Sequence, residues 1–181
     1  RALKKLENLQ TRGGVSYEAL LIADGGENLK AIAALLPYYD IDPKKIKMLG
    51  TGHWDLSGIG SEPALVGGWF AAPSADGRRD FENQYNSVFG ATPPRLATLA
   101  YDATALAAVF AQTDKKTSEE TSRSAYTVSA LVAPQGFKGL DGVFRFTSMG
   151  FVERSLSIFQ VGERDNKVIS PAPQTFESNL K

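Results

Sequence analysis

Short apolar runs alternate with longer amphipathic stretches in the first third of the chain. An apolar run at 17–23 is followed by the turn Asp24-Gly25-Gly26 and by a stretch at 27–39 whose apolar residues recur every three or four positions. That spacing predicts a helix with one buried stripe, formed by Leu29, Ile32, Ala33, Leu36 and Tyr39. A second short run lies at 46–50, so the region predicts a right-handed parallel βαβ unit.

The rest of the chain predicts one more buried strand, two helices and a β-rich end. A strand at 65–71 is closed by Pro73, because proline cannot donate to a strand ladder. Helices are predicted at 76–89 and from Pro93-Pro94 to about Gln112. Alternating and hairpin-like patterns favour strands at 142–146, 156–161 and 167–169. The apolar residues of this half are expected to share one core: Phe81, Tyr85, Leu99, Leu106, Phe110, Phe144 and Phe146.

Composition removes several classes of function. Of the 181 residues 43% are hydrophobic and 22% charged, which permits a packed core. Lys plus Arg equals Asp plus Glu at 20 each, so net charge provides no attraction to nucleic acid. The absence of cysteine excludes disulfides, thiol catalysis and cysteine-based zinc sites within this segment. The chain begins with Arg1 and not with methionine, from which we expect that the natural N-terminus has been removed.

Five segments in a particular order carry a family resemblance. They are Leu49-Gly50-Thr51-Gly52-His53-Trp54, Gly67-Gly68-Trp69-Phe70-Ala71-Ala72-Pro73, Phe81–Gly90, Ala100-Tyr101-Asp102-Ala103-Thr104-Ala105-Leu106 and Gly136–Phe146. The series resembles the second half of the leucine/isoleucine/valine-binding family of periplasmic proteins. It is most similar to a branch described as penicillin-binding-protein activators, and the resemblance covers about residues 17–161.

The resemblance implies an α/β fold of the type I periplasmic binding proteins, in which two lobes with three-layer parallel sheets enclose a ligand in a cleft. The chain would be a fragment that lacks the N-terminal half. Residues 1–71 would form a βαβ segment of the C-terminal lobe, 72–150 would return to the N-terminal lobe, and 151–181 would supply closing strands and a tail.

The fold class also places the candidate ligand site. Ligands of open α/β sheets lie beyond the carboxyl ends of the strands. The residues that follow the first two predicted strands are therefore candidates, and the resemblance adds an aromatic residue and its neighbour from the long helix. The set is Asp24, Gly25, Gly26, Glu27, Thr51, His53, Trp54, Tyr101 and Asp102. For each of these a purely structural role stays open, and Trp69, inside a strand, is expected in the core.

Catalytic and metal sites find no support in the sequence. His53 is the only histidine, so a zinc site would have to combine His53 with carboxylates only, which is a poor ligand set for zinc. No Gly-x-Ser-x-Gly elbow and no phosphate-cradling glycine signature is present. We therefore expect a binding protein without catalytic residues, metal or cofactor.

Two functions follow from the resemblance and stay open. The first is a periplasmic protein that presents a small polar solute to an ABC permease. The second is a periplasmic regulator that contacts a penicillin-binding protein, with lipid anchoring undecided. The amino-acid binders of the family hold the ligand's ammonium with an acidic residue at the second strand end. Here Gly50-Thr51-Gly52-His53 carries none before Asp55, which argues against a branched-chain amino acid ligand.

Overall fold

A computed structural model describes residues 15–74, 77–121 and 126–176, without the side chains of 114–121. The chain forms two compact units. Unit 1 comprises Arg1–Ala72 and Ile158–Ser170, and unit 2 comprises Pro73–Ser157 and Pro171–Lys181. Within the predicted last segment, 151–181, unit 1 includes residues 158–170.

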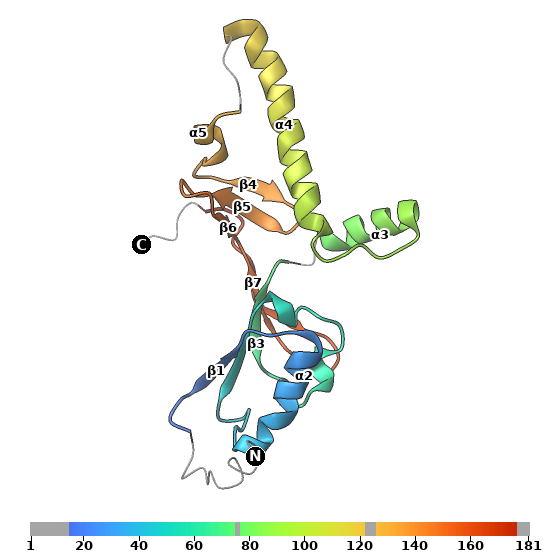
Figure 1. The fold of residues 1–181 in the computed structure, drawn as a ribbon, viewed down its shortest axis with the longest axis vertical. Coiled ribbons are helices and arrows are strands. Elements are labelled where there is room, and N and C mark those ends of the chain that lie inside the picture. The colour runs from blue at the N-terminus through green and yellow to red at the C-terminus, as the bar shows by residue number, and fades with distance from the viewer. Residues whose placement is uncertain (1–14, 75–76, 122–125, 177–181) are drawn as a thin grey trace, which may run out of the picture. The chain divides into compact units, whose positions relative to one another are not determined.

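Unit 1 is built on a five-stranded sheet with the strand order β1-β2-β3-β7-β8 (Figure 1). The first three strands are parallel and β7 pairs antiparallel with β8, so the sheet is mixed. The βαβ unit and the terminal hairpin are both as predicted. The elements are β1 (Ala19–Ile22), α2 (Gly26–Leu35), η1 (Pro37–Tyr39), β2 (Lys47–Gly50), η2 (Gly52–Trp54), η3 (Ile59–Ser61), β3 (Trp69–Ala72), β7 (Ser157–Gln160) and β8 (Lys167–Ser170).

The core of unit 1 lies between α2 and one face of the sheet. The helix contributes Leu29, Ala33 and Leu36, and the sheet contributes Met48 and Phe70 among others. The predicted stripe is confirmed at these three helix positions, and Leu36 is only 4% exposed. Tyr39 does not belong to it, since Pro37 begins a separate 3-10 turn and Tyr39 is exposed.

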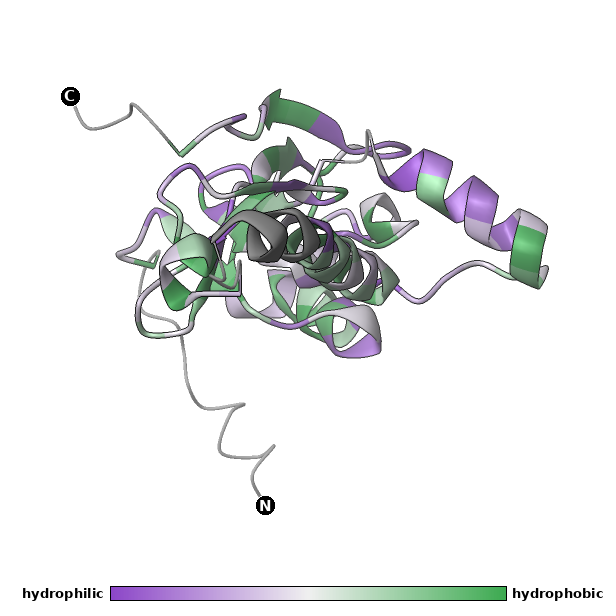
Figure 2. Cartoon of the chain, turned by 90° about the horizontal axis from the view of Figure 1, so that it is seen from above, coloured by the Kyte–Doolittle hydropathy of each residue, from purple (hydrophilic) through white to green (hydrophobic). Residues whose placement is uncertain are grey.

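Unit 2 combines helices with a small antiparallel sheet. Its helices are α3 (Arg78–Phe89), α4 (Ala97–Thr121) and α5 (Val128–Leu131), and its sheet has the order β4 (Phe137–Gly139), β5 (Gly142–Phe146) and β6 (Val152–Arg154). β4 and β6 escaped prediction, because three-residue strands carry too little alternation. Figure 2 shows that α3 is largely hydrophilic but ends in a hydrophobic turn, where Val88 and Phe89 are exposed.

Two buried carboxylates fasten α4 and the segment before it to this sheet. Asp141 is 1% exposed and accepts hydrogen bonds from Arg95 and from the Thr98 hydroxyl, the latter at 2.7 Å. Asp102 accepts from the Leu140 amide at 2.7 Å and from Arg154 at 3.2 Å. Charge-assisted bonds of this kind are shorter and stronger than hydrogen bonds between neutral groups.

The single core predicted for the second half of the chain is not present. Of the seven residues expected in it only Phe144 is buried, and Leu99 is exposed. Their ring contacts form two series among the described residues, one around Phe81 and Tyr85 and one that runs from Phe110 through Phe137 to Phe144. Much of the apolar surface of α4 is therefore open to solvent.

Candidate functional site

A polar rim lies at the carboxyl ends of β1 and β2. We define it as Asp24, Gly25, Gly26, Glu27, Thr51 and His53. The two loops touch, because a Cβ atom on Gly25 would lie 2.9 Å from both Cβ and the carbonyl oxygen of His53. Sequence reasoning placed both loops at the same sheet edge, and the structure brings them into contact at this position. Only glycine permits so close an approach.

Local hydrogen bonds shape each half of the rim. The Asp24 carboxylate accepts from the Gly25 amide at 2.8 Å, as aspartates in turns often do. Gly26 follows with φ of 58°, a left-handed conformation that suits glycine, and begins α2. On the other loop the Thr51 hydroxyl caps η2 by accepting from the His53 amide at 3.4 Å.

Trp54 is not a ligand contact, and its assignment to the cleft was wrong. The side chain is fully buried, and its indole nitrogen donates to the Ile22 carbonyl at 3.1 Å. Its ring also fills the space that a side chain on Gly50 would need. The hydrogen bond of Trp54 thus links the end of β1 to the loop after β2 and holds the two halves of the rim together.

Trp69 departs from expectation in the opposite direction. It was expected in the core, yet it is 40% exposed on the sheet face that α2 does not cover. The Lys47 ammonium lies 4.8 Å from its ring centroid, within cation–π distance. The strand alternation that buries Phe70 turns Trp69 outward.

The rim is rich in hydrogen-bond acceptors. The Glu27 side chain is exposed and bonds Lys30 at 2.8 Å, and this hydrogen bond raises the pKa of Lys30. Asp24, the Thr51 hydroxyl and exposed His53 complete its polar groups. Among the described residues no cluster of three or more potential metal ligands occurs. The rim can therefore accept hydrogen bonds from a polar solute.

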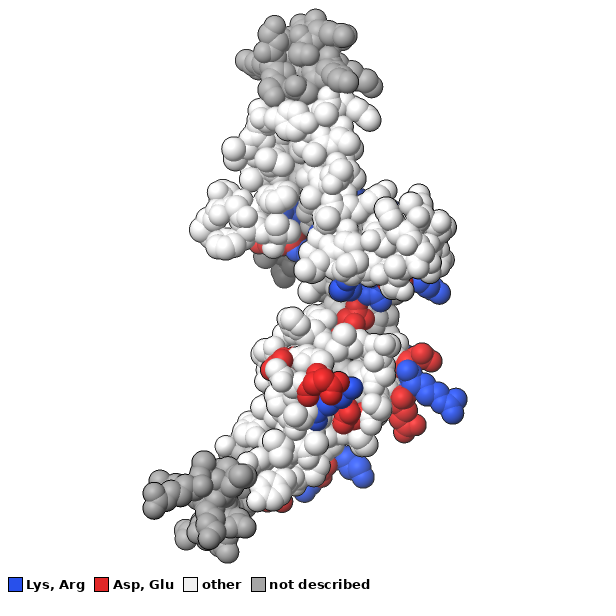
Figure 3. All heavy atoms as spheres, turned by 45° about the vertical axis from the view of Figure 1, so that its right-hand side comes forward, with Lys and Arg blue, Asp and Glu red and all other residues white. Residues whose placement is uncertain are grey.

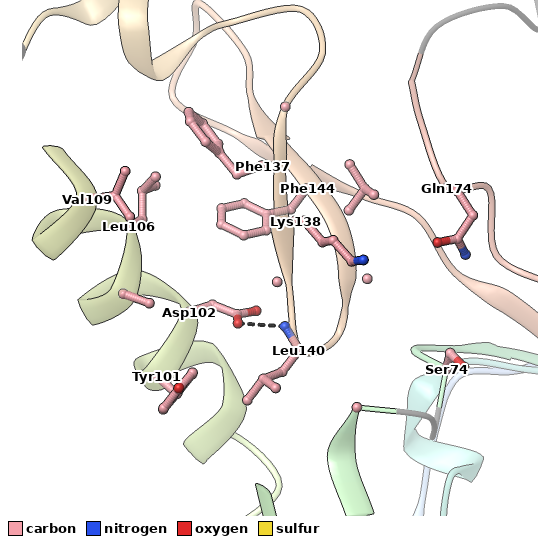
Figure 4. A pocket seen from close by; sticks show the side chains of 16 residues that line it. Ser74, Tyr101, Asp102, Leu106, Val109, Phe137, Lys138, Leu140, Phe144 and Gln174 are labelled. Carbon is pink, nitrogen blue, oxygen red and sulfur yellow. Dashed lines mark hydrogen bonds between the residues drawn. The ribbon is translucent and has the colours of Figure 1, made fainter. Parts of the chain in front are cut away.

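Tyr101 and Asp102 line a separate hollow of about 760 Å3 inside unit 2. Figure 4 shows Phe137 and Phe144 pointing toward Leu106 and Val109 of α4, whereas Lys138 points toward Gln174. Phe137, Lys138 and Gln174 were missed because β4 was not predicted and residues from 171 on were interpreted as a tail. The quoted segment Gly136–Phe146 carried the only signal for Phe137 and Lys138, and no signal pointed to Gln174.

Asp102 performs a structural task in this hollow. Both of its carboxylate oxygens have partners, the Leu140 amide and the Arg154 guanidinium, and the residue is 5% exposed. Tyr101, by contrast, is half exposed and its ring contacts Phe81 at 5.5 Å between centroids. Only Tyr101 of the pair presents a free surface that a ligand or partner could touch.

Solved structures show what this fold is similar to. One, described as a branched-chain amino acid ABC transporter of Rhodospirillum rubrum, has a TM-score of 0.64 and 20% identity over 84% of this chain and 44% of that one. LivJ of Streptococcus pneumoniae, solved in complex with isoleucine, has a TM-score of 0.52 and 16% identity over 94% of this chain and 48% of its own.

A third structure is the C-domain of LpoA from Haemophilus influenzae, a regulator of PBP1A. Its TM-score is 0.54 and its identity 13%, over 92% of this chain and 49% of its own. No family model matches the sequence, and no curated protein matches it at a significant level. These structures confirm the expected fold, that of the type I periplasmic binding proteins, and this chain spans less than half the length of each.

The described helices include none with the length and hydrophobicity needed to cross a membrane.

Proposed function

We propose that the chain is part of a periplasmic solute-binding protein and that the rim of unit 1 is one wall of its ligand site. The observation that carries this proposal is the contact between the two rim loops, Gly25 against His53, at the carboxyl ends of parallel strands. That is where ligands bind in open α/β sheets. The solute is small and polar and would be passed to an ABC permease.

Each rim group has a defined task in this proposal. The amides that open α2 and the Thr51 hydroxyl provide hydrogen bonds, and Asp24 accepts bonds from donors on the solute. Gly25 and Gly26 let the solute approach the backbone, since neither carries a side chain. Unit 1 would belong to the C-terminal lobe, and unit 2 would pack on an N-terminal lobe supplied by polypeptide before Arg1. The LivJ and Rhodospirillum structures support this reading by their fold alone.

A thermal-shift screen of polar solutes tests the proposal on the chain extended by the residues that its gene encodes before Arg1. A solute at 100 times its dissociation constant stabilises the native state by about 2.7 kcal/mol, which is readily measured. Gly25→Val should abolish the shift, because its side chain would collide with His53. Lys44→Ala, in the loop between α2 and β2, is the control. An equal shift in Gly25→Val would contradict the assignment of the rim.

The second candidate is a regulator that binds a penicillin-binding protein through unit 2. A specific feature favours it: between Ala97 and Gln112 the only charged residue is Asp102, and that residue is buried. The rest of this stretch exposes Leu99, Tyr101 and Val109. On the face shown in Figure 3, charged side chains gather over unit 1, whereas the described side chains of α4 are almost all uncharged. Exposed apolar patches of this kind mark interaction surfaces.

A pull-down separates the two candidates. The extended chain, with no solute added, should retain a purified class A penicillin-binding protein if the regulator proposal holds. Val109→Lys should then release it, and Val88→Lys on α3 is the control, since Val88 is exposed as well. Retention by both variants would exclude the α4 surface, and no retention at all would leave solute binding as the function to pursue.

A further inference from the structure

The strand β4 leaves one edge of the sheet in unit 2 without a neighbour among the described residues. The sheet has the order β4-β5-β6, so β4 has a strand partner on one side only. Its middle residue, Lys138, lies opposite Val143 of β5. The backbone groups of Val143 are bonded on the β6 side. Its amide donates to the Ser155 hydroxyl at 3.1 Å, and its carbonyl accepts from the Ser155 amide at 2.8 Å.

Lys138 therefore turns its own N–H and C=O away from β5. Opposite residues of an antiparallel pair alternate between those that exchange both backbone hydrogen bonds and those that exchange none. Because Val143 is bonded to Ser155, the pair that it forms with Lys138 is of the second kind. The described residues supply no partner for these two backbone groups of Lys138. Unpaired backbone groups on a sheet edge are a template for a further strand.

The hollow of about 760 Å3 in unit 2 lies along β4 and differs on the two faces of the strand. On one face Phe137 points toward Leu106 and Val109 of α4, and on the other Lys138 points toward Gln174 (Figure 4). Successive side chains of a strand alternate between faces, which accounts for this division. A strand added at the edge of β4 would thus meet an apolar surface on one face and a cation on the other.

Lys138 carries the uncompensated charge of this hollow. Asp102 and Lys138 are the only charged residues among those that line it. The Asp102 carboxylate is paired with Arg154 at 3.2 Å and also accepts from the Leu140 amide. The exposed Lys138 ammonium has no anionic partner in the described part of the chain. An added strand is therefore favoured when it places an acidic side chain opposite Lys138, because cross-strand pairs of opposite charge stabilise a sheet.

We propose that the edge of β4 binds an extended peptide of a partner protein, which adds as an antiparallel strand and has the pattern apolar–acidic–apolar. The acidic residue lies opposite Lys138, exchanges both backbone hydrogen bonds with it and pairs with its ammonium. The two apolar neighbours face the side of Phe137, against Leu106 and Val109. This mode of recognition combines backbone hydrogen bonds for affinity with alternate side chains for specificity.

A second copy of the chain fits this edge less well. Antiparallel pairing of two β4 strands about Lys138 would place the two lysines opposite each other, and like charges in that position destabilise a sheet. The inference goes beyond the proposed function, because it uses unit 2 alone and needs no solute at the rim.

Fluorescence anisotropy with a labelled peptide tests the proposal. The probe is fluorescein-labelled Thr-Val-Glu-Val-Thr with an amidated C-terminus, and the chain should bind it saturably. Replacement of the central Glu by Lys should weaken binding about tenfold, since a charge-assisted contact is lost. N-methylation of the same Glu should weaken binding by a similar factor. It removes the N–H that bonds to the Lys138 carbonyl, yet it keeps the carboxylate and both valines.

A charge exchange shows whether Lys138 selects the acidic residue. Lys138→Glu should weaken binding of the Glu peptide and should bind the Lys peptide about tenfold more tightly than the unaltered chain does. Lys44→Glu makes the same change in the loop between α2 and β2 of unit 1, and it should alter neither affinity. Lys138 is exposed, so both variants should keep the urea midpoint of the unaltered chain. The N-methylated peptide provides a test that needs no variant.

Several results would overturn the proposal. The Glu peptide could fail to bind, or the Glu and Lys peptides could bind equally, so that Lys138 selects nothing. Equal binding of the N-methylated peptide would show that the peptide does not add to the strand edge. A dimer of the free chain that the peptide dissociates, measured by sedimentation, would assign the edge to a second copy. Binding that requires removal of residues 177–181 would assign it to the chain's own end.

Discussion

Single residues in this protein are constrained most where glycine or tryptophan controls the spacing of backbones. Gly25 and Gly50 are needed because His53 and Trp54 press against them. The sequence signalled both positions as turns at strand ends, and that was enough to locate the rim. It could not tell which of the two tryptophans is buried. The third strand was predicted to begin at residue 65, but β3 begins at Trp69, which lies on the exposed side of the strand. The residues before it form turns, with Gly67 at φ of 84°.

Trp54→Phe should destabilise unit 1 more than Trp69→Phe. The first substitution leaves the buried Ile22 carbonyl without its donor, which costs about 1–3 kcal/mol. The second shortens an exposed side chain, and surface changes stay within about 0.5 kcal/mol. Far-UV circular dichroism in urea measures both without relying on tryptophan emission. Equal losses of stability would show that the indole hydrogen bond contributes nothing.

Asp102→Ala should destabilise unit 2 strongly. The substitution leaves Arg154 and the Leu140 amide without their acceptor, and breaking a buried ion pair costs about 3–5 kcal/mol. The control is Glu153→Ala, which breaks the exposed pair with Arg145, since such pairs contribute about 0–1 kcal/mol. Hydrogen exchange of the amides in α4 and β5 reports both effects. Similar exchange in the two variants would mean that Asp102 does not fasten α4.

At the scale of elements, long amphipathic patterns predicted structure well and short ones did not. The stripe of α2 and the β7–β8 hairpin were foreseen because apolar spacing and turn residues agree there. The helix predicted from Pro93-Pro94 to about Gln112 is longer in the structure, where α4 runs from Ala97 to Thr121. β4 and β6 pair with β5 on both sides, and only that tertiary pairing makes strands of three residues stable.

Leu36→Ala and Leu35→Ala make a matched pair at the end of α2. Leu36 is buried in the core of unit 1, so its truncation should cost about 2–5 kcal/mol. Leu35 is 51% exposed, and its truncation should change the free energy of unfolding by less than about 0.5 kcal/mol. Urea unfolding followed by tryptophan fluorescence reports unit 1 alone, because both tryptophans lie there. A reversed order would show that the helix faces the sheet in another register.

At the scale of the whole molecule, the order of segments identified the fold, although no one motif could. The sequence could not show which apolar side chains are exposed among the described residues of each unit, because a chain of average hydrophobicity gives no sign of which residues its core fails to bury. In unit 1 this surface is the row through Leu21 and Trp69, and in unit 2 it is the stretch of α4 that exposes Leu99, Tyr101 and Val109. Exposed apolar surface of this kind marks a place where a protein contacts a partner or ligand.

Free leucine should not bind to this chain, for two independent reasons. In the proposed site the rim is only one wall, and contacts from one wall do not offset the association cost, put at about 4–15 kcal/mol. The loop from Gly50 to His53 also offers no carboxylate to a ligand ammonium. Burying an ammonium without a partner costs several kcal/mol of binding free energy. Isothermal titration with leucine should thus be flat for the chain as given and for its extended form. Micromolar binding by the extended form alone would show that Asp24, Glu27 or Asp55 replaces the missing clamp, and would leave the one-wall argument intact. Micromolar binding by the chain as given would refute both reasons, because it would make the rim of unit 1 a complete amino-acid site.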